Sequence, residues 1–483
     1  FTSPDINAFD NHIQNITIDV DTKNPLYNAY ISIDTIHNKN YKVSDFNLIN
    51  VTLNDTLFVR SEFKGGAKNQ DSYDLNLYHT IDEENQSVIG FKKSEVAFKE
   101  YTWFINENET NDNKIVFDKL LKNFDFQKIS LSHNNQKMDF YGKMRDSTYK
   151  NFNLTFEDID LEEVAGRLDS LSVGGKVSGV VQYKKDKNIY DPISDITIDS
   201  LEINKIVLGD LNFSIKGNEN FNQFKVNSSI KQDRKEHFFL NGDVNFVGQQ
   251  SSLLLEAGFD QFKLAPFGPL LGNVLADVRG TATGRATVRG SLSDPEVDGR
   301  LYLNDAGMRV PYLNVDYAFE KNAIIDLTEH QFSLRKIEVT DTKYNTKGVL
   351  DGTIRHEKFG DWQLNLHLNS DNILALDTED TEEAYYYGTA FMKGSASITG
   401  TINALNIKVS GESEKGTSIK IPVNNSEDIG DNSFIKFMTQ DEYKKMKEGN
   451  IIETNKYQGI ELVLDFDIDQ AATIEIILDR SSG

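Results

Sequence analysis

An internal repeat constrains the fold of this chain more than any other feature of its sequence. One set of apolar positions matches a second set at a constant offset: Phe156, Ile159, Leu161, Val164, Leu168 and Leu171 correspond to Phe259, Phe262, Leu264, Phe267, Leu271 and Val274. After a short slip, Gly175 and Gly179 match Gly280 and Gly284. A third copy near Gly388 keeps the glycine spacing. Such repeats predict one long body built from similar units.

Each clear copy opens with apolar residues at a helical period. The stripe from Leu264 to Val274 recurs every three or four residues, and Pro266 lies where a first helical turn accepts proline. We therefore expect a few short helices that cap the repeats, at Phe156–Leu171, Phe259–Leu275, Ile115–Phe124 and Phe434–Lys447.

Elsewhere apolar and polar residues alternate, which is typical of strands with one face against an apolar interior. Ile16, Ile18 and Val20 show this pattern near the start of the chain, and Leu464-Asp-Phe-Asp-Ile468 shows it near the end. Turn-forming clusters such as Lys64-Gly-Gly-Ala-Lys68 separate the segments, so mostly antiparallel pairing is expected. About 30 strands at ~4.8 Å spacing would span roughly 140 Å.

So few helices cannot cover the apolar face of so large a sheet, which must fold over itself or hold apolar material. The predicted fold is all-β: an elongated, repeat-built, mostly antiparallel sheet that forms a U-shaped groove, with a few short capping helices. The expected divisions are N-terminal groove repeats at 1–155, groove repeats at 156–258 and 259–370, and a truncated C-terminal groove segment at 371–483.

Composition excludes several classes of function. The chain has 75 acidic and 51 basic residues, a formal net charge of −24 that repels nucleic acid and anionic lipid headgroups at long range, so specific binding to either surface is not expected. It has no cysteine, which excludes disulfides and thiolate catalysis. Asp465, Asp467 and Asp469 lack the glycine turn of a calcium loop, and no histidines have metal-binding spacing. We expect no catalytic residue, metal or cofactor.

Membrane insertion is not expected from this sequence. The longest uncharged apolar-leaning run, Leu264 to Ala276, contains prolines and glycines and is shorter than the ~20 residues that a membrane span needs. The chain begins at Phe1 without a signal-like region, so a leader or anchor is expected upstream in a longer parent protein.

Several glycine-rich segments resemble one known family. In order, Val278-Arg-Gly-Thr-Ala-Thr-Gly-Arg-Ala-Thr-Val-Arg-Gly290, Ser293-Asp-Pro-Glu-Val-Asp-Gly-Arg-Leu301 and Tyr387-Gly-Thr-Ala-Phe-Met-Lys-Gly-Ser-Ala-Ser-Ile-Thr-Gly400 resemble the TamB family of the AsmA-like superfamily. The resemblance runs from about Phe259 to Gly483, so 259–370 would contain the start of a TamB-like C-terminal domain.

The resemblance implies a β-taco that spans the periplasm of a diderm bacterium. Its parent protein would be anchored in the inner membrane by an N-terminal helix that this chain lacks, and would work with a TamA-like outer-membrane barrel. The implied role is to conduct phospholipid between the membranes and to support outer-membrane protein assembly. The expected partners are therefore phospholipid acyl chains and the barrel, without enzymatic activity.

A lipid conduit needs an uninterrupted apolar wall. Exposing two acyl chains of ~15 methylenes each to water costs on the order of 24 kcal/mol, at ~0.8 kcal/mol per methylene. The residues predicted to line this wall occupy alternate positions along their strands, on the apolar face; we call this alternation the parity of the strand. They are Leu301, Leu303, Leu364, Leu366, Leu368, Ile398, Ile407, Val409, Leu464, Phe466, Ile468, Ile474 and Ile476.

Two other hypotheses compete with the conduit. The first is a purely structural or adhesive β-solenoid whose apolar face is a dry core. The second is a β-helix enzyme that acts on polysaccharide, which is weaker because β-helix coils of roughly 20 to 30 residues are much shorter than this repeat. Lipid extracted from the purified protein distinguishes the conduit from the solenoid.

Overall fold

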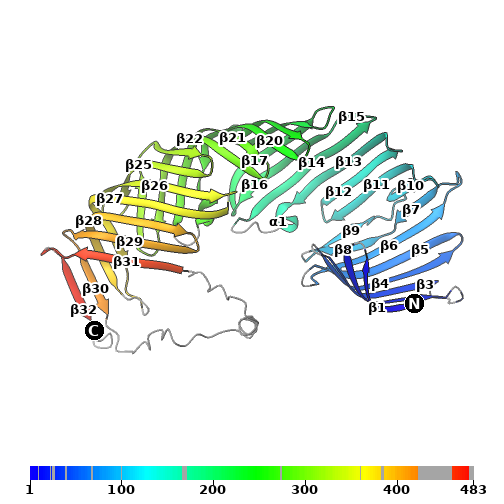
Figure 1. The fold of residues 1–483 in the computed structure, drawn as a ribbon, viewed down its shortest axis with the longest axis horizontal. Coiled ribbons are helices and arrows are strands. Elements are labelled where there is room, and N and C mark those ends of the chain that lie inside the picture. The colour runs from blue at the N-terminus through cyan, green and yellow to red at the C-terminus, as the bar shows by residue number, and fades with distance from the viewer. Residues whose placement is uncertain are drawn as a thin grey trace. The chain divides into compact units, whose positions relative to one another are not determined.

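The structure is a computed structural model and is almost entirely β. It describes the chain except residues 9, 22, 24–27, 39–40, 67–68, 99, 166–170, 272–274, 359, 382–385, 423–458, 471 and 478–483. The described residues form 32 strands, one α-helix and one 3-10 helix (Figure 1). The prediction of an all-β, repeat-built and mostly antiparallel fold is confirmed.

The contacts within the chain separate two compact units. Unit 1 comprises Phe1–Leu168 and Ser172–Ser251, and unit 2 comprises Asp169–Leu171 and Ser252–Gly483. Their division lies close to the start of the repeat predicted at Phe259.

Unit 1 is a series of antiparallel hairpins in which most strands pair with the next strand along the chain. The β8–β9 hairpin is an exception, because β8 pairs with β6 and β9 pairs with β11. The strands are β1 Thr2–Ala8, β2 Asn11–Val20, β3 Ala29–His37, β4 Lys42–Leu53, β5 Thr56–Gly65, β6 Asp71–Ile81, β7 Ser87–Phe91, β8 Ser94–Phe98, β9 Tyr101–Ile105, β10 Lys114–Phe117, β11 Asn123–His133, β12 Gln136–Arg145, β13 Tyr149–Asp160, β14 Val173–Asp186, β15 Ile189–Tyr190, β16 Ile193–Ile203, β17 Ile206–Gly217, β18 Gln223–Gln232 and β19 Lys235–Val247.

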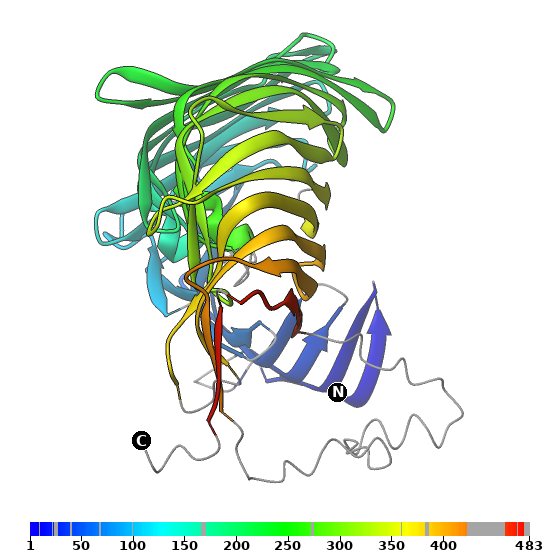
Figure 2. The ribbon, with the colours of Figure 1, turned by 90° about the vertical axis from the view of Figure 1, so that its left-hand side faces the viewer.

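Unit 2 contains longer strands and ends in parallel pairs. The strands are β20 Gln250–Lys263, which begins at the division, β21 Ala276–Ser291, β22 Asp294–Val310, β23 Val315–Phe319, β24 Ala323–Thr328, β25 Gln331–Asp341, β26 Lys347–Glu357, β27 Gly360–Thr378, β28 Tyr387–Thr401, β29 Ala404–Ser413, β30 Ser418–Pro422, β31 Gly459–Asp467 and β32 Thr473–Ile477. Strands β29 and β31 are parallel, as are β30 and β32. Figure 2 shows that the long strands of unit 2 curve strongly along their length.

The helices are shorter than the sequence predicts. Among the residues that the structure describes in the two repeat segments, only α1 (Leu161–Val164) and the 3-10 helix η1 (Ala265–Leu271) are helical. The Asp160 carboxylate caps α1 by accepting the Glu162 N–H at 3.0 Å. Pro269 lies inside η1 and has no N–H to donate to the preceding turn, so it opposes a long regular helix here. The segments before them continue β13 and β20 as strands.

A β-bulge explains why the first half of each repeat imitates a helix. The β13–β14 register shifts between Phe156 and Ile159, and the β20–β21 register shifts between Phe259 and Phe262. A bulge adds one residue to a strand, so two residues that face the same side are three positions apart instead of two. That i, i+3 spacing is also the spacing of one helical face.

The helix predicted at Ile115–Phe124 is wrong. This stretch is the end of β10, a turn and the start of β11, with Phe117 directly opposite Phe124. The Asp118 carboxylate accepts the Lys122 N–H at 2.9 Å, which closes the turn and lowers the pKa of Asp118. The helix predicted at Phe434–Lys447 lies outside the described residues.

The register of the strands shows that the repeat is a structural unit. Before each bulge, Phe156 pairs with Gly179 and Phe259 pairs with Gly284. The bulge residues Asp158 and Gln261 both adopt a left-handed backbone, with φ of 52° and 51°. Their N–H groups donate to equivalent hydroxyls, Asp158 to Ser178 at 3.1 Å and Gln261 to Thr283 at 3.0 Å.

The same bulge recurs in the third copy and in other places that sequence reasoning missed, including β11, where Phe126 pairs with Gly142 before a shift to Ile129, and β25. Ser370 pairs with Gly394 before a shift to Ile373, and Leu334 pairs with Gly352 before a shift to Ile337. Because bulges bend the strands that carry them, their repetition gives the sheet its curvature.

Candidate functional site: the apolar face of the sheet

An unbroken series of aromatic side chains crosses unit 1 on one face of the sheet. We call this series the aromatic row. Successive ring centroids lie between 5.1 and 6.5 Å apart. Its members are Phe117, Phe124, Phe126, Phe140, Phe152, Tyr183, Tyr190, Phe221, Phe224 and Phe246.

Strand register brings these rings together. Phe152 lies directly opposite Tyr183 across β13 and β14, and their centroids are 6.5 Å apart. Gly142 lies between Phe126 and Phe152 in the register of β11, β12 and β13. A Cβ at Gly142 would lie 2.8 Å from the Phe152 ring, so only glycine lets Phe126 and Phe152 meet across β12, at 5.5 Å.

The aromatic row keeps contact with solvent. All of its rings are half-buried except Phe221, which is exposed, and none is fully buried. Aromatic side chains bury a large area when a second layer covers them. A partly open apolar surface of this length is typical of a binding surface.

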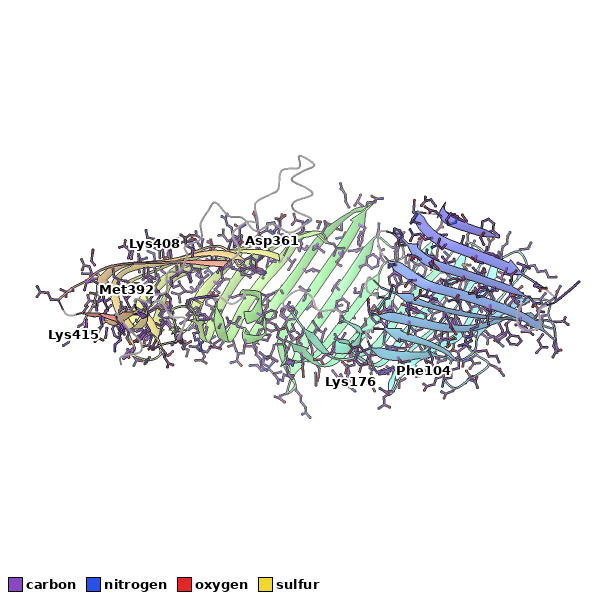
Figure 3. All side chains as sticks on the ribbon, turned by 90° about the horizontal axis from the view of Figure 1, so that it is seen from below. Phe104, Lys176, Asp361, Met392, Lys408 and Lys415 are labelled. Carbon is purple, nitrogen blue, oxygen red and sulfur yellow. The ribbon has the colours of Figure 1, made fainter. Side chains whose placement is uncertain are left out.

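The inward face of unit 2 is different, because it forms a packed core. Val315, Ile337, Ile373, Leu376 and Met392 have no solvent-exposed surface. Figure 3 shows side chains projecting from both faces of the strands: Met392 belongs to this core, whereas Lys408 on β29 is exposed.

The predicted lining residues all lie in unit 2 and fall into three groups. Leu303, Leu364, Leu366, Leu368, Ile407 and Val409 are buried in the core. Leu301, Ile398, Leu464 and Phe466 are partly buried against it. Ile468, Ile474 and Ile476 are exposed, by 49%, 39% and 63%. The structure therefore brings the first two groups together and leaves the third exposed, although parity treats all three alike, and lipid contact at these residues stays a prediction.

Little space remains inside this core. Its cavity has a volume of about 50 Å³ and is lined by residues such as Val339, Leu366 and Val409. That volume holds a few water-sized groups, far less than an acyl chain needs. Among the described residues, the inward face of unit 2 is therefore a packed core with little free space.

Hydrogen bonds at Leu374 join the second half of β27 to Tyr317 on β23 and to Thr346, which precedes β26. The Tyr317 hydroxyl donates to the Leu374 carbonyl at 2.8 Å, and the Leu374 N–H donates to the Thr346 hydroxyl at 2.8 Å. Burial raises the pKa of Tyr317, and the nearby Asp341 carboxylate raises it further, so the phenol stays protonated and can donate. The Lys343 ammonium also pairs with Asp377 at 2.5 Å. Sequence reasoning missed these bonds, because Tyr317 occupies an apolar position in an alternating pattern like many other residues of the chain.

Polar side chains on the other face form structural ion pairs. Asp326 is buried, accepts a hydrogen bond from Arg300 at 2.7 Å and forms an ion pair with Arg335. Asp316 binds Arg279 through both carboxylate oxygens. Among the described residues, no group of three or more acidic or histidine side chains is placed to hold a metal ion.

The fold and this face define a class of protein. A bulged, mostly antiparallel sheet with an apolar inward face and a polar outer face belongs to the repeat-built, all-β class of proteins. No helix in the described part of the chain has the length and apolar character needed to span a membrane.

The comparison with protein families then identifies the C-terminal part. Residues 335–482 match the family model described as the TamB C-terminal domain, which agrees with the predicted resemblance to the C-terminal part of TamB-family proteins. The family has a role in outer-membrane assembly and is associated with the cell envelope, where it spans the periplasm. No curated protein and no solved structure matches the chain.

Proposed function

We propose that this chain carries phospholipid through the periplasm on the aromatic row and the aliphatic residues beside it. The observation that supports this most directly is that the rings of the row are only partly buried. They present a continuous apolar surface to solvent, whereas the residues of a dry core would be covered. From β10 to β19 the row extends about 40 Å at ~4.8 Å per strand. A lipid on this surface keeps its acyl chains out of water as it moves.

The proposal includes the partners expected from the family resemblance. The parent protein would be held in the inner membrane and would deliver lipid toward a TamA-like outer-membrane barrel, in support of outer-membrane biogenesis. The chain would act without catalysis and without a cofactor, because transfer along an apolar wall forms and breaks no covalent bond. Its net charge of −24 disfavours nucleic acid as a partner.

Lipid extraction from the full chain tests the proposal. Phospholipid should co-purify with the wild-type protein, as measured by mass spectrometry of the organic extract. Replacing Phe126 and Phe152 together with Asp should reduce this lipid about tenfold, because two charges interrupt the row. Asn151→Asp with Asn227→Asp adds the same charges on the opposite face and should leave the lipid content unchanged. Circular dichroism checks that all proteins are folded. Wild-type protein without phospholipid would contradict the proposal.

A structural role fits the core of unit 2 better than lipid carriage does. The observation that favours it is the complete burial of residues such as Ile407 and Val409, which were predicted to line the groove. For this part of the chain, the dry-core hypothesis explains the packing without a ligand.

A further inference from the structure

Two lysines lie directly opposite each other on the lipid-facing side of unit 1. Lys150 on β13 pairs in register with Lys185 on β14. Two residues further along these strands, Phe152 and Tyr183 form the next pair on the same face. The lysines are therefore at the margin of the aromatic row, next to the turn between β14 and β15.

Both lysines are half-buried and have aromatic or apolar neighbours in the sheet. Neither ammonium forms an ion pair with a carboxylate in the described part of the chain. The Lys185 ammonium lies 5.4 Å from the centre of the Tyr190 ring, and Met144 is opposite Lys150 on its other side.

Two neighbouring acidic groups are on the other face or occupied. Asp186 follows Lys185 and therefore points to the opposite side of β14. Asp125 is bound to Arg145 at 2.6 Å. Like charges directly opposite each other destabilise an antiparallel pair. In a chain with a net charge of −24, two adjacent unpaired lysines on an apolar face favour an anionic ligand.

We propose that Lys150 and Lys185 bind the phosphate of a phospholipid whose acyl chains lie on the aromatic row. This inference rests on the proposed function and adds a position for the headgroup. Directly opposed residues have Cβ atoms about 5 Å apart, so two flexible lysine side chains can donate to one phosphate group. Aromatic side chains concentrate where the polar part of a lipid meets its acyl chains, and Phe152 and Tyr183 lie at that level beside the lysines.

The test compares ligands that share acyl chains but differ in phosphate. The full chain is titrated with vesicles containing fluorescently labelled phosphatidylglycerol, phosphatidylethanolamine or diacylglycerol, and lipid transfer to the protein is measured. The wild-type protein should take up both phospholipids about tenfold better than diacylglycerol, since charge-assisted bonds to phosphate are lost with diacylglycerol. Lys150→Ala with Lys185→Ala should abolish this preference and still take up diacylglycerol.

A matched control removes two lysines from the opposite face. Lys143→Ala with Lys184→Ala deletes the same charge from exposed positions on β12 and β14, and should keep the tenfold preference. If the Lys150 and Lys185 variant also keeps it, the headgroup site is wrong and the proposed function is untouched. If the wild-type protein takes up neither phospholipid nor diacylglycerol, the proposed function itself fails.

A last arm separates lipid phosphate from free phosphate. Inorganic phosphate at millimolar concentration should not displace phosphatidylglycerol from the wild-type protein, because the acyl chains contribute most of the binding. Displacement by inorganic phosphate alone would assign the lysine pair to a soluble anion and would overturn the proposal.

Discussion

At the scale of single residues, burial separates side chains that sequence parity treats alike. Leu366 and Phe152 both lie on the apolar side of their strands, but Leu366 is 2% exposed in a packed core and Phe152 is half-buried on an open face. Leu366→Asp should therefore lower the free energy of unfolding by about 3 kcal/mol or more, because it buries a carboxylate. Phe152→Asp should cost about 1 kcal/mol, because water reaches the new charge.

Urea unfolding of both variants measures this difference. Asp467→Ala, at an exposed position on β31, serves as a control and should change stability by less than about 0.5 kcal/mol. Equal destabilisation by Leu366→Asp and Phe152→Asp would mean that the face of unit 1 is as tightly packed as the core of unit 2.

The buried His356 should make stability depend on pH. It packs against Phe332 and Trp362, and burial lowers its pKa, with His330 lowering it further. A histidine whose folded pKa is below its unfolded value near 6.5 resists protonation in the folded state. Its stabilising contribution is present above pH 6.5 and is lost as the pH falls through the folded pKa.

Thermal denaturation between pH 7.5 and pH 5 tests this dependence. The melting temperature of the His356→Phe variant should fall less over that range than that of the wild-type protein. Replacing the exposed His367 with Phe should leave the wild-type pH dependence intact. Parallel curves for wild type and His356→Phe would assign the acid sensitivity to other groups.

At the scale of elements, the glycines opposite the bulges hold the repeat together. A Cβ on Gly284 would lie 2.1 Å from the Arg300 carbonyl oxygen of β22, and a Cβ on Gly179 would lie 2.2 Å from the Asp195 carbonyl oxygen of β16. Neither backbone atom can move without separating the paired strands. Gly284→Ala and Gly179→Ala should each destabilise the protein by about 2 kcal/mol or more.

Gly360→Ala is the control for these glycine variants. Its nearest atom is the Glu357 carbonyl oxygen at 3.5 Å, an ordinary contact, so this change should be nearly neutral. Chemical denaturation of the three variants gives the comparison. A neutral Gly284→Ala would show that the β21–β22 pair can shift, and the repeat would then lack a fixed register.

The sequence predicts helices and strands well where the spacing of its apolar residues fits only one of them. It predicts them poorly where a helix and a bulged strand would give the same spacing. Alternation indicated most strands, and the offset between the Phe156 and Phe259 segments correctly identified equivalent structures. The helices were predicted too long because a bulged strand and a helix both place apolar residues at i and i+3. Gly179 and Gly284 could have resolved this ambiguity, because each lies opposite the residue before the bulge.

The candidate site was less predictable than the fold. The alternation of apolar and polar residues shows which face of a strand is apolar. Whether solvent reaches that face depends on which segments pack over it, and those segments can be distant in the sequence. The predicted lining residues are mostly core, and the open aromatic row of unit 1 was not singled out. The ring contacts across β11, β12 and β13 need the register around Gly142, which no local pattern specifies.

At the scale of the whole molecule, the two units should differ in their access to lipid. A photo-crosslinking residue at Phe152 in unit 1 should capture phospholipid in cells, whereas one at Asn151, on the opposite face of β13, should not. In unit 2, Phe466 packs against the filled core, so a crosslinker there should capture much less lipid than one at Phe152. Asp467, exposed on the same strand, is the control for nonspecific labelling.

Each outcome of this crosslinking experiment decides a separate point. Equal capture at Phe152 and Asn151 would contradict the assignment of the lipid-facing side in unit 1. Strong capture at Phe466 above the level of Asp467 would mean that the core of unit 2 opens to admit acyl chains. For such opening, the bonds that hold β27 across the core, including the Tyr317 to Leu374 hydrogen bond, would have to break. Tyr317→Phe, which removes only that hydroxyl, should then increase capture at Phe466 and leave capture at Phe152 unchanged.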